Sequence, residues 1–421
     1  MIKAPFHVLM CSVFVLTFGL LMPQAKSDER RVVPAADLLV KQKFKALAGL
    51  RIGLIANHTS RVGTSHLLDL LHAAPNVTLK AILTPEHGLR GTADAGAHVK
   101  DGRDAKTSVP IFSLYGKTRK PTAKMLKHID ALVFDIQDIG ARFYTYITTM
   151  GLAMQAAAKA GIPFYVLDRP NPLGGNYVSG FMLERQHTSF VGQFAIPISH
   201  GMTIGELARM IKGENLLPGL KSLELKVLPM KGWQRDMLWP QTGLAWQPTS
   251  PAIPGFENAL TYPGMAFFEA SSINYGRGTK SPFKIFGAPW INGPALAKTL
   301  NARKLPGVSF KATRFTPSAI PGSARPPKFK GQNISGVELV ITDPQTYQPV
   351  ETGIEVLCAL SQHARGKPAR LISRPKWLAS LAGTDRLYQK LKQGACGKQI
   401  ARSWQSDIEK FKKRRKKYLL Y

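Results

Sequence analysis

The chain has 421 residues, which is enough for two domains with a sizeable core. Hydrophobic residues make up 44 % of the chain and charged residues 20 %, a balance that excludes a mainly disordered protein. The formal net charge of +31 points to an anionic partner, of which nucleic acid is one class and cell-envelope polymers are another.

The first 25 residues have the pattern of a secretory signal peptide. Lys3 is the only Lys, Arg, Asp or Glu before Lys26, and an apolar run from Val8 to Met22 is followed by the small residue Ala25. Because about 20 apolar residues are needed to span a bilayer, we favour cleavage over an uncleaved anchor. We therefore expect a periplasmic or secreted protein without a stable membrane span. Loss of Lys3 lowers the net charge only to +30, and an exported protein meets anionic cell-envelope material rather than nucleic acid.

Four short apolar runs in the first half of the chain predict strands, at residues 51–57, 77–85, 131–138 and 164–170. Helical patterns lie between them, at residues 64–74, 121–129 and 145–161. Strands that alternate with helices predict βαβ units and a parallel sheet covered on both faces.

The second half of the chain is punctuated by proline and turn residues. Residues 239–264 predict a long ordered loop or lining segment, and residues 335–343 predict a strand. Helical patterns at residues 354–363 and in the last forty residues complete a second α/β domain. The basic tail, residues 409–421, is interpreted as a solvated helix end in preference to a tether for an anionic surface.

A helix start near residue 203 marks the predicted domain boundary. Thr203 and Glu206 have the spacing of a capping box, in which each side chain satisfies a free N–H group of the first turn. This structural role is preferred to a catalytic one for Glu206. The expected organisation is a signal peptide at residues 1–25, a parallel-sheet domain at 35–200 and a second α/β domain with a basic tail at 201–421.

Polar side chains follow every predicted strand of the first domain. In an open parallel sheet, ligands bind beyond the carboxyl ends of the strands, so four such clusters favour one shared site. In chain order they contain Asn57 and His58; Glu86 and His87; Asp135, Gln137, Asp138, Arg142 and Tyr144; and Asp168, Arg169 and Asn171.

Most of these residues have a structural alternative. Asp138 and Arg142 have the spacing of an ion pair at a helix start, and Asp168 and Arg169 can hold a turn. Glu86 is the hardest to explain in this way. An acid packed at the end of an apolar strand is disfavoured as an anion, which suits a general acid.

The motifs that are missing narrow the chemistry. No G-x-G-x-x-G, Walker A, G-x-S-x-G or H-E-x-x-H motif occurs, which disfavours dinucleotide, ATP, serine-hydrolase and zincin chemistry. We expect no cofactor. A hard-cation site stays open, because carboxylates with one histidine could form it, but no ligand spacing demands one; the candidates are Glu86, His87, Asp135, Asp138 and Asp168. Cys358 and Cys396 permit one disulfide in an oxidising compartment.

Six sequence blocks stand out along the chain: PEHGLRG, SLYGKTRKPT, VFDIQDIGARFYTYI, VLDRPNPLGG, SFVGQFAIPISHGMTIGELA and YGRGTKSPFKIFGAPW. They resemble the exo-β-N-acetylmuramidases of the NamZ type, glycoside hydrolase family 171, formerly a domain of unknown function. The resemblance covers residues 38–347, in order and with similar spacing.

The resemblance implies a Rossmann-like N-terminal domain, a smaller α/β C-terminal domain and an active-site cleft between them. It also implies removal of a terminal N-acetylmuramic acid (MurNAc) from the non-reducing end of peptidoglycan fragments, in cell-wall turnover. Carried onto this chain, it adds His200, Arg277 and Glu269 to the strand-end residues as candidate sugar-binding groups. The chain departs from the family pattern at Tyr275, where a glutamate is usual, and at Ala252, where an asparagine is usual.

Glycoside cleavage needs an acid at the leaving oxygen and charge stabilisation on the other face of the sugar. Glu86 is the candidate acid, with His87 beside it, and Asp135 or Asp138 is the candidate second carboxylate. The sequence does not distinguish a retaining, an inverting and a substrate-assisted mechanism. Arg142, Arg169 and Arg277 are candidates for binding the lactyl carboxylate of MurNAc. The alternatives are a metal-dependent hydrolase of an acidic cell-envelope substrate and a non-catalytic peptidoglycan-binding protein.

Overall fold

The computed structural model describes residues 1–2, 32–89, 101–319, 326–363 and 371–421. Apart from residues 1 and 2, the predicted signal peptide lies outside this part of the chain. No helix within the described residues is long and apolar enough to cross a bilayer.

A seven-stranded, mostly parallel sheet forms the centre of the N-terminal lobe. Its strands in spatial order are β5 (Gly102–Arg103), β6 (Pro110–Ser113), β4 (Thr78–Thr84), β1 (Arg51–Ala56), β7 (Ala131–Asp135), β8 (Phe164–Leu167) and β9 (Leu225–Leu228). Only the edge strand β5 runs antiparallel to its neighbour. The six parallel strands follow the 3-2-1-4-5-6 order of the Rossmann fold, so the strand order reverses between β1 and β7.

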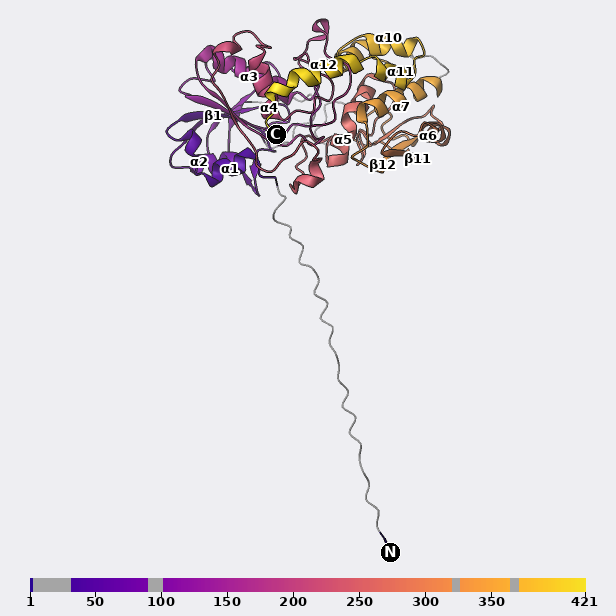
Figure 1. The fold of residues 1–421 in the computed structure, drawn as a ribbon, viewed down its shortest axis with the longest axis horizontal. Helices are drawn as coiled ribbons and strands as arrows, with labels where there is room; N and C mark the ends of the chain where they lie inside the picture. Colours follow the sequence, from indigo (N-terminus) through magenta and orange to yellow (C-terminus); the bar gives the residue numbers. More distant parts are fainter. Residues whose placement is uncertain (3–31, 90–100, 320–325, 364–370) are drawn as a thin grey trace.

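Helices cover both faces of this sheet because the buried side chains of each strand alternate between two cores. Leu54 packs with α1 (Ala35–Lys41) and α2 (Leu67–Ala73), whereas its neighbour Ile55 belongs to the core beneath α3 (Tyr146–Ala160) and α4 (Ile204–Gly213). Figure 1 shows α1 and α2 on one side of the sheet and α3 and α4 on the other. The capping box of α4 is confirmed, since Thr203 and Glu206 each accept the backbone N–H group of the other.

The C-terminal lobe is built on a three-stranded antiparallel sheet in the order β10 (Ile285–Ala288), β12 (Ile334–Ile341) and β11 (Val308–Phe315). Its helices are α5 (Phe256–Met265), α6 (Gly293–Ala302), α7 (Pro349–His363), α9 (Pro375–Ala382), α10 (Arg386–Lys392), α11 (Gly397–Arg402) and α12 (Gln405–Arg415). One hydrophobic core continues from the α3 face of the large sheet into this lobe. The expected two-domain α/β architecture is confirmed.

Three parts of the chain differ from the sequence-based expectations. Residues 121–129 form turns instead of a helix, and His128 there has a left-handed backbone that interrupts any helical run. The predicted loop at 239–264 includes most of α5, despite Pro263 inside that helix. The large sheet also reaches beyond residue 200, because β9 pairs with β8.

The basic C-terminal segment is docked on the N-terminal lobe. Phe411, Arg415 and Tyr418 are buried, and the Arg415 guanidinium donates hydrogen bonds to the carbonyl oxygens of His200 and Gly175, each at 2.9 Å. Figure 1 shows α12 crossing from the C-terminal lobe back towards the large sheet. The tail is therefore an ordered connection between the lobes and not a solvated helix end.

Candidate active site

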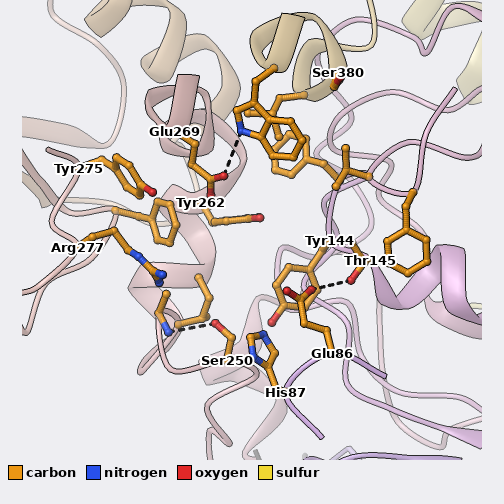
Figure 2. Close-up of a pocket in the computed structure, with 18 of the residues that line it drawn as sticks. Glu86, His87, Tyr144, Thr145, Ser250, Tyr262, Glu269, Tyr275, Arg277 and Ser380 are labelled. Carbon is orange, nitrogen blue, oxygen red and sulfur yellow. Dashed lines mark hydrogen bonds between the residues drawn. The ribbon is translucent and has the colours of Figure 1, made fainter. Parts of the chain in front are cut away.

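A cavity of about 580 Å³ lies between the two lobes, a volume typical of small-molecule sites. The N-terminal lobe contributes the loops that follow β4, β6 and β7. The C-terminal lobe contributes residues between α5 and β10, the chain at 326–328, and α9. Figure 2 shows side chains from both lobes directed into this space.

Glu86 and His87 line the cavity in a tight turn directly after β4. The turn is closed by a hydrogen bond of 3.1 Å from the Gly88 N–H group to the Pro85 carbonyl oxygen. His87 has a left-handed backbone with φ of 71°, which is uncommon for a residue with a Cβ atom. Such strain costs on the order of 1–3 kcal/mol and is concentrated at functional sites.

Two hydroxyl groups hold the Glu86 carboxyl in place. The Thr145 hydroxyl, at the start of α3, donates to Oε2 of Glu86 at 3.1 Å (Figure 2). The Tyr115 hydroxyl, in the loop after β6, also hydrogen-bonds to this carboxyl, and burial together with the nearby carboxylate raises the pKa of Tyr115. Glu86 is therefore oriented by residues that follow two other strands of the same sheet, β6 and β7.

Tyr144 forms part of the cavity wall, whereas Tyr146 is enclosed behind it. Their rings meet edge to face with centroids 4.9 Å apart. The Tyr144 hydroxyl donates to the Thr249 hydroxyl and the Tyr146 hydroxyl donates to the Thr249 carbonyl oxygen, each at 2.9 Å. The predicted lining segment at 239–264 is thus pinned to the N-terminal lobe, and its residues Ser250 and Ala252 line the cavity.

The opposite wall, from the C-terminal lobe, combines one carboxyl with several cations. Glu269 accepts a hydrogen bond of 3.3 Å from the Trp377 indole N–H group, and burial raises the pKa of Glu269 while the nearby Arg277 opposes that rise. Lys328 donates to the Ser271 and Ile273 carbonyl oxygens, and burial lowers the pKa of its ammonium group to about 8.

Tyr275, one of the two departures from the family pattern, is part of the same wall. Its ring stacks on Phe283 with centroids 5.4 Å apart, and the Lys328 ammonium lies 5.5 Å from its centroid. Ala252, the other departure, also lines the cavity. Both departures therefore change the surface that a ligand in the cavity would meet.

Five of the fourteen predicted site residues line the cavity: Glu86, His87, Tyr144, Glu269 and Arg277. The other nine lie outside its lining: Asn57, Asp135, Gln137, Asp138, Arg142, Asp168, Arg169, Asn171 and His200. Their contacts are to other parts of the protein. All nine are buried, with exposed fractions of 7 % or less.

Asp135 and Arg169 form a buried, bidentate ion pair between the ends of β7 and β8. Nε of Arg169 lies 2.6 Å from Oδ1 of Asp135, and a second guanidinium nitrogen lies 2.8 Å from Oδ2. Both charges are satisfied by each other, so neither side chain is directed to a ligand in the cavity.

The remaining polar residues hold loops together. Asp168 accepts hydrogen bonds of 2.8 Å from the Thr203 hydroxyl, the Gly205 N–H group and the Tyr421 hydroxyl. The Arg142 guanidinium donates to the carbonyl oxygens of Phe181, Ile196 and Leu381, at 2.7–2.9 Å, and so ties the lobes together.

Contacts between loops account for four of the five that remain, Asp138 being the fifth. The Asn57 side chain accepts from Thr59, and the Gln137 amide donates to the Asp138 and Pro170 carbonyl oxygens. The Asn171 amide donates to the Met202 carbonyl oxygen, and Nδ1 of His200 accepts from the Met202 N–H group.

Asp138 provides a test of pH dependence. Burial raises the pKa of its carboxyl from 3.8 to about 7, although the N–H groups of Gly140 and Ile139 partly offset this. The folded state then binds the proton more tightly than the unfolded state, so this group's contribution to stability declines as the pH rises from about 4 to 7. We expect Asp138→Asn to remove that decline. The thermal unfolding midpoint of the variant, measured from pH 4 to pH 7, should fall less steeply with pH than the midpoint of the wild type.

The matched control for this experiment is Asp236→Asn, at an exposed position. Its unfolding midpoints should follow the wild-type pH profile. Parallel profiles for Asp138→Asn and the wild type would contradict the raised pKa.

Several residues of the cavity were not identified from the sequence, among them Tyr115, Arg119, Thr145, Lys328, Arg374 and Trp377. Tyr115 follows β6, a strand of four residues that is too short to stand out as an apolar run. Recognition of that strand would have placed Tyr115 at the same sheet edge as Glu86. The cations from residues 328 and 374 carry no local signal, because only the packing of the two lobes brings them to the cavity.

The sequence does not decide whether the chain has a metal site or a disulfide. Among the described residues, no group of three or more His, Cys, Asp and Glu side chains is arranged to hold a metal ion. Cys358 is buried and Cys396 is exposed, and the two are not joined by a disulfide.

Comparison with known proteins identifies the family. The family described as exo-β-N-acetylmuramidase NamZ, N-terminal, matches residues 52–257, and its C-terminal counterpart matches residues 260–421. The chain belongs to the NamZ family. The curated peptidoglycan β-N-acetylmuramidase NamZ of Bacillus subtilis is 41 % identical over 97 % of this chain and 99 % of its own length.

Two solved structures of DUF1343 family proteins from Bacteroides fragilis share the NamZ fold of this chain. One is 38 % identical with a TM-score of 0.85, and the other is 34 % identical with a TM-score of 0.76. Each alignment covers 93 % of this chain and 99 % of the solved chain. Both lobes of this chain are therefore present in these two solved structures.

Proposed function

We propose that this chain is an exo-acting β-N-acetylmuramidase that releases terminal MurNAc from the non-reducing end of peptidoglycan fragments. The observation that carries the proposal is the Glu86 carboxyl, held by the Thr145 hydroxyl and directed into the cavity between the lobes. Membership in the NamZ family and 41 % identity to a curated peptidoglycan β-N-acetylmuramidase support it.

Glu86 acts as the general acid. Its carboxyl O–H group gives a proton to the glycosidic oxygen while the bond from that oxygen to the anomeric carbon breaks and its electron pair moves to the oxygen. Water then forms the new bond to the anomeric carbon, and the proton it releases restores the proton that Glu86 gave, directly or through solvent, so the net reaction is hydrolysis. The Thr145 and Tyr115 hydroxyls keep the carboxyl in one orientation, which general acid catalysis requires.

The cations in the wall from the C-terminal lobe, which include Arg277 and Lys328, provide selectivity for MurNAc. MurNAc differs from N-acetylglucosamine (GlcNAc) by a lactyl group with a carboxylate, and guanidinium groups bind carboxylates in a bidentate manner. Of the three arginines proposed from the sequence, Arg277 alone lines the cavity. Arg142 and Arg169 are engaged by backbone carbonyls and by Asp135.

Arg277→Met should weaken binding of MurNAc glycosides. A hydrogen bond to a charged group contributes about 1.5–3 kcal/mol, so we expect KM for a MurNAc glycoside to rise about 10- to 100-fold. Steady-state kinetics on MurNAc and GlcNAc glycosides measure the effect. If KM and the preference for MurNAc over GlcNAc glycosides are both unchanged, another cation of this wall binds the lactyl group.

The first experiment is an activity assay on the chain from Lys26 onward. It uses a chromogenic β-MurNAc glycoside and the disaccharide MurNAc-GlcNAc, each with and without EDTA, and matching β-GlcNAc substrates as controls. We expect MurNAc release that EDTA does not affect and little release of GlcNAc. Loss of release with EDTA would favour the metal-dependent alternative. No release from either substrate would mean that Tyr275 and Ala252 have changed the substrate or removed catalysis.

We also propose that the chain is exported and acts in the periplasm or outside the cell, with peptidoglycan-derived saccharides as its substrates. The proposal rests on the signal-peptide pattern of residues 1–25. Mass spectrometry of the protein from fractionated cells should find a mature N-terminus near residue 26 in the periplasm or the medium. Recovery of a cytoplasmic chain that retains residues 1–25 would contradict it.

A further inference from the structure

The cavity contains two carboxyl groups among its described lining residues, Glu86 and Glu269. Glu86 belongs to the N-terminal lobe and Glu269, in the 3₁₀ turn Ala266–Ala270, belongs to the C-terminal lobe. Figure 2 shows them on opposite walls, both directed into the space between. They are also electrostatically coupled, since the Glu86 carboxylate contributes to raising the pKa of Glu269.

The other acids considered for the second role lie elsewhere. Asp135 is neutralised by the bidentate contact with Arg169, and Asp138 accepts the Gly140 N–H group at 2.8 Å outside the cavity lining. Cleavage of a glycoside with oxocarbenium character requires negative charge near the anomeric carbon as well as an acid at the leaving oxygen. Glu269 is positioned to supply that charge.

We propose that Glu269 is the second catalytic carboxylate of this enzyme, which stabilises the positive charge that develops at the anomeric carbon while Glu86 protonates the leaving oxygen. This inference rests on the proposed muramidase function. One of the two catalytic carboxylates then belongs to the C-terminal lobe, and Glu269 takes part in the chemical step instead of only binding the sugar.

Three neighbours favour the ionised form of Glu269. Burial is the largest influence and raises the pKa of its carboxyl, whereas Arg277, the Trp377 indole N–H group, which donates to Oε2 at 3.3 Å, and Lys328 oppose that rise. The indole also fixes the orientation of the carboxylate, so Trp377 is a positioning residue. These three partners belong to the C-terminal lobe, as Glu269 does.

Leaving-group dependence distinguishes the two carboxylates. A 4-nitrophenyl leaving group needs little protonation, whereas the sugar hydroxyl of MurNAc-GlcNAc needs full protonation. Glu269→Gln should therefore lower kcat by about 10²–10³-fold on both substrates, the range for loss of one electrostatic stabiliser. Glu86→Gln should lower kcat strongly on the disaccharide and much less on the nitrophenyl glycoside.

Glu257→Gln is the matched control, because Glu257 is a half-exposed glutamate of α5 that pairs with Lys284 away from the cavity. It should leave both rates unchanged. If the wild type releases MurNAc and Glu269→Gln keeps kcat within about threefold while KM rises, Glu269 only binds sugar and the inference is wrong. If the wild type itself releases no MurNAc, the proposed function fails instead.

Trp377→Phe provides a second readout that does not depend on removing the carboxylate. Loss of the indole donor raises the pKa of Glu269, because that hydrogen bond lowers it. The carboxylate must be ionised to act, so the acidic limb of the kcat profile should move to higher pH. An acidic limb at the wild-type position, together with normal folding by circular dichroism, would contradict a catalytic role for Glu269.

Discussion

Glu86→Gln is expected to lower kcat on MurNAc-GlcNAc by about 10²–10⁴-fold, the contribution of a positioned general acid. The glutamine side chain is close in size and still accepts the Thr145 hydrogen bond through its amide oxygen, so the fold should be intact. Stopped assays that quantify released MurNAc measure the loss of kcat, and circular dichroism verifies that the variant is folded.

A Glu86→Gln enzyme with wild-type kcat on the disaccharide would remove Glu86 from the mechanism. Thr145→Val is a useful companion, since it removes the hydroxyl that orients the carboxyl and keeps the carboxyl itself. We expect an intermediate kcat for it. Equal loss in both variants would indicate that orientation, and not the presence of the carboxyl, limits the reaction.

Arg169→Met is expected to destabilise the protein by about 3–5 kcal/mol, which is typical when one partner of a buried ion pair is removed. Asp135 has no exposed surface, so its carboxylate would be left buried without a counter-charge. Equilibrium unfolding in urea, monitored by fluorescence and by circular dichroism, gives the change in the free energy of unfolding.

The double variant Asp135→Asn/Arg169→Met separates structure from catalysis. It removes both charges and should recover a large part of the lost stability. Its kcat per folded molecule should stay near the wild-type value, because neither residue lines the cavity. A stable double variant without activity would show that Asp135 and Arg169 take part in catalysis, as the sequence pattern indicated.

The contrast between Glu86 and Asp135 shows how far sequence reasoning reaches at this site. Glu86 follows β4 and Asp135 is the last residue of β7, two strands that apolar runs predicted correctly, so both lie at the carboxyl edge of the sheet. The pattern places a residue at that edge but does not show what its side chain contacts. Arg169, 34 positions later in the chain, neutralises Asp135, and this pairing depends on the neighbouring positions of β7 and β8.

The C-terminal wall illustrates a different limit. Only the resemblance to family sequence blocks indicates Glu269 and Arg277, because no local periodicity shows that they face Glu86. Lys328 and Trp377 carry no pattern of their own, since their place in the cavity depends on how α9 and the chain near residue 328 pack against the first lobe. Four of the strands, their parallel pairing and the two covered faces of the sheet were accessible from local patterns, whereas the full strand order and the contacts between the lobes were not.

The docked C-terminal segment has a consequence for biosynthesis. The Tyr421 hydroxyl completes the hydrogen bonds of Asp168 at the end of β8, and the Leu420 N–H group donates to the Glu206 carboxylate at 2.8 Å. More than 250 residues separate Asp168 from Tyr421 along the chain. The first lobe therefore leaves the ribosome long before the partner of its own buried carboxyl has been synthesised. We therefore expect the first lobe to complete its folding only after the second lobe has been translated.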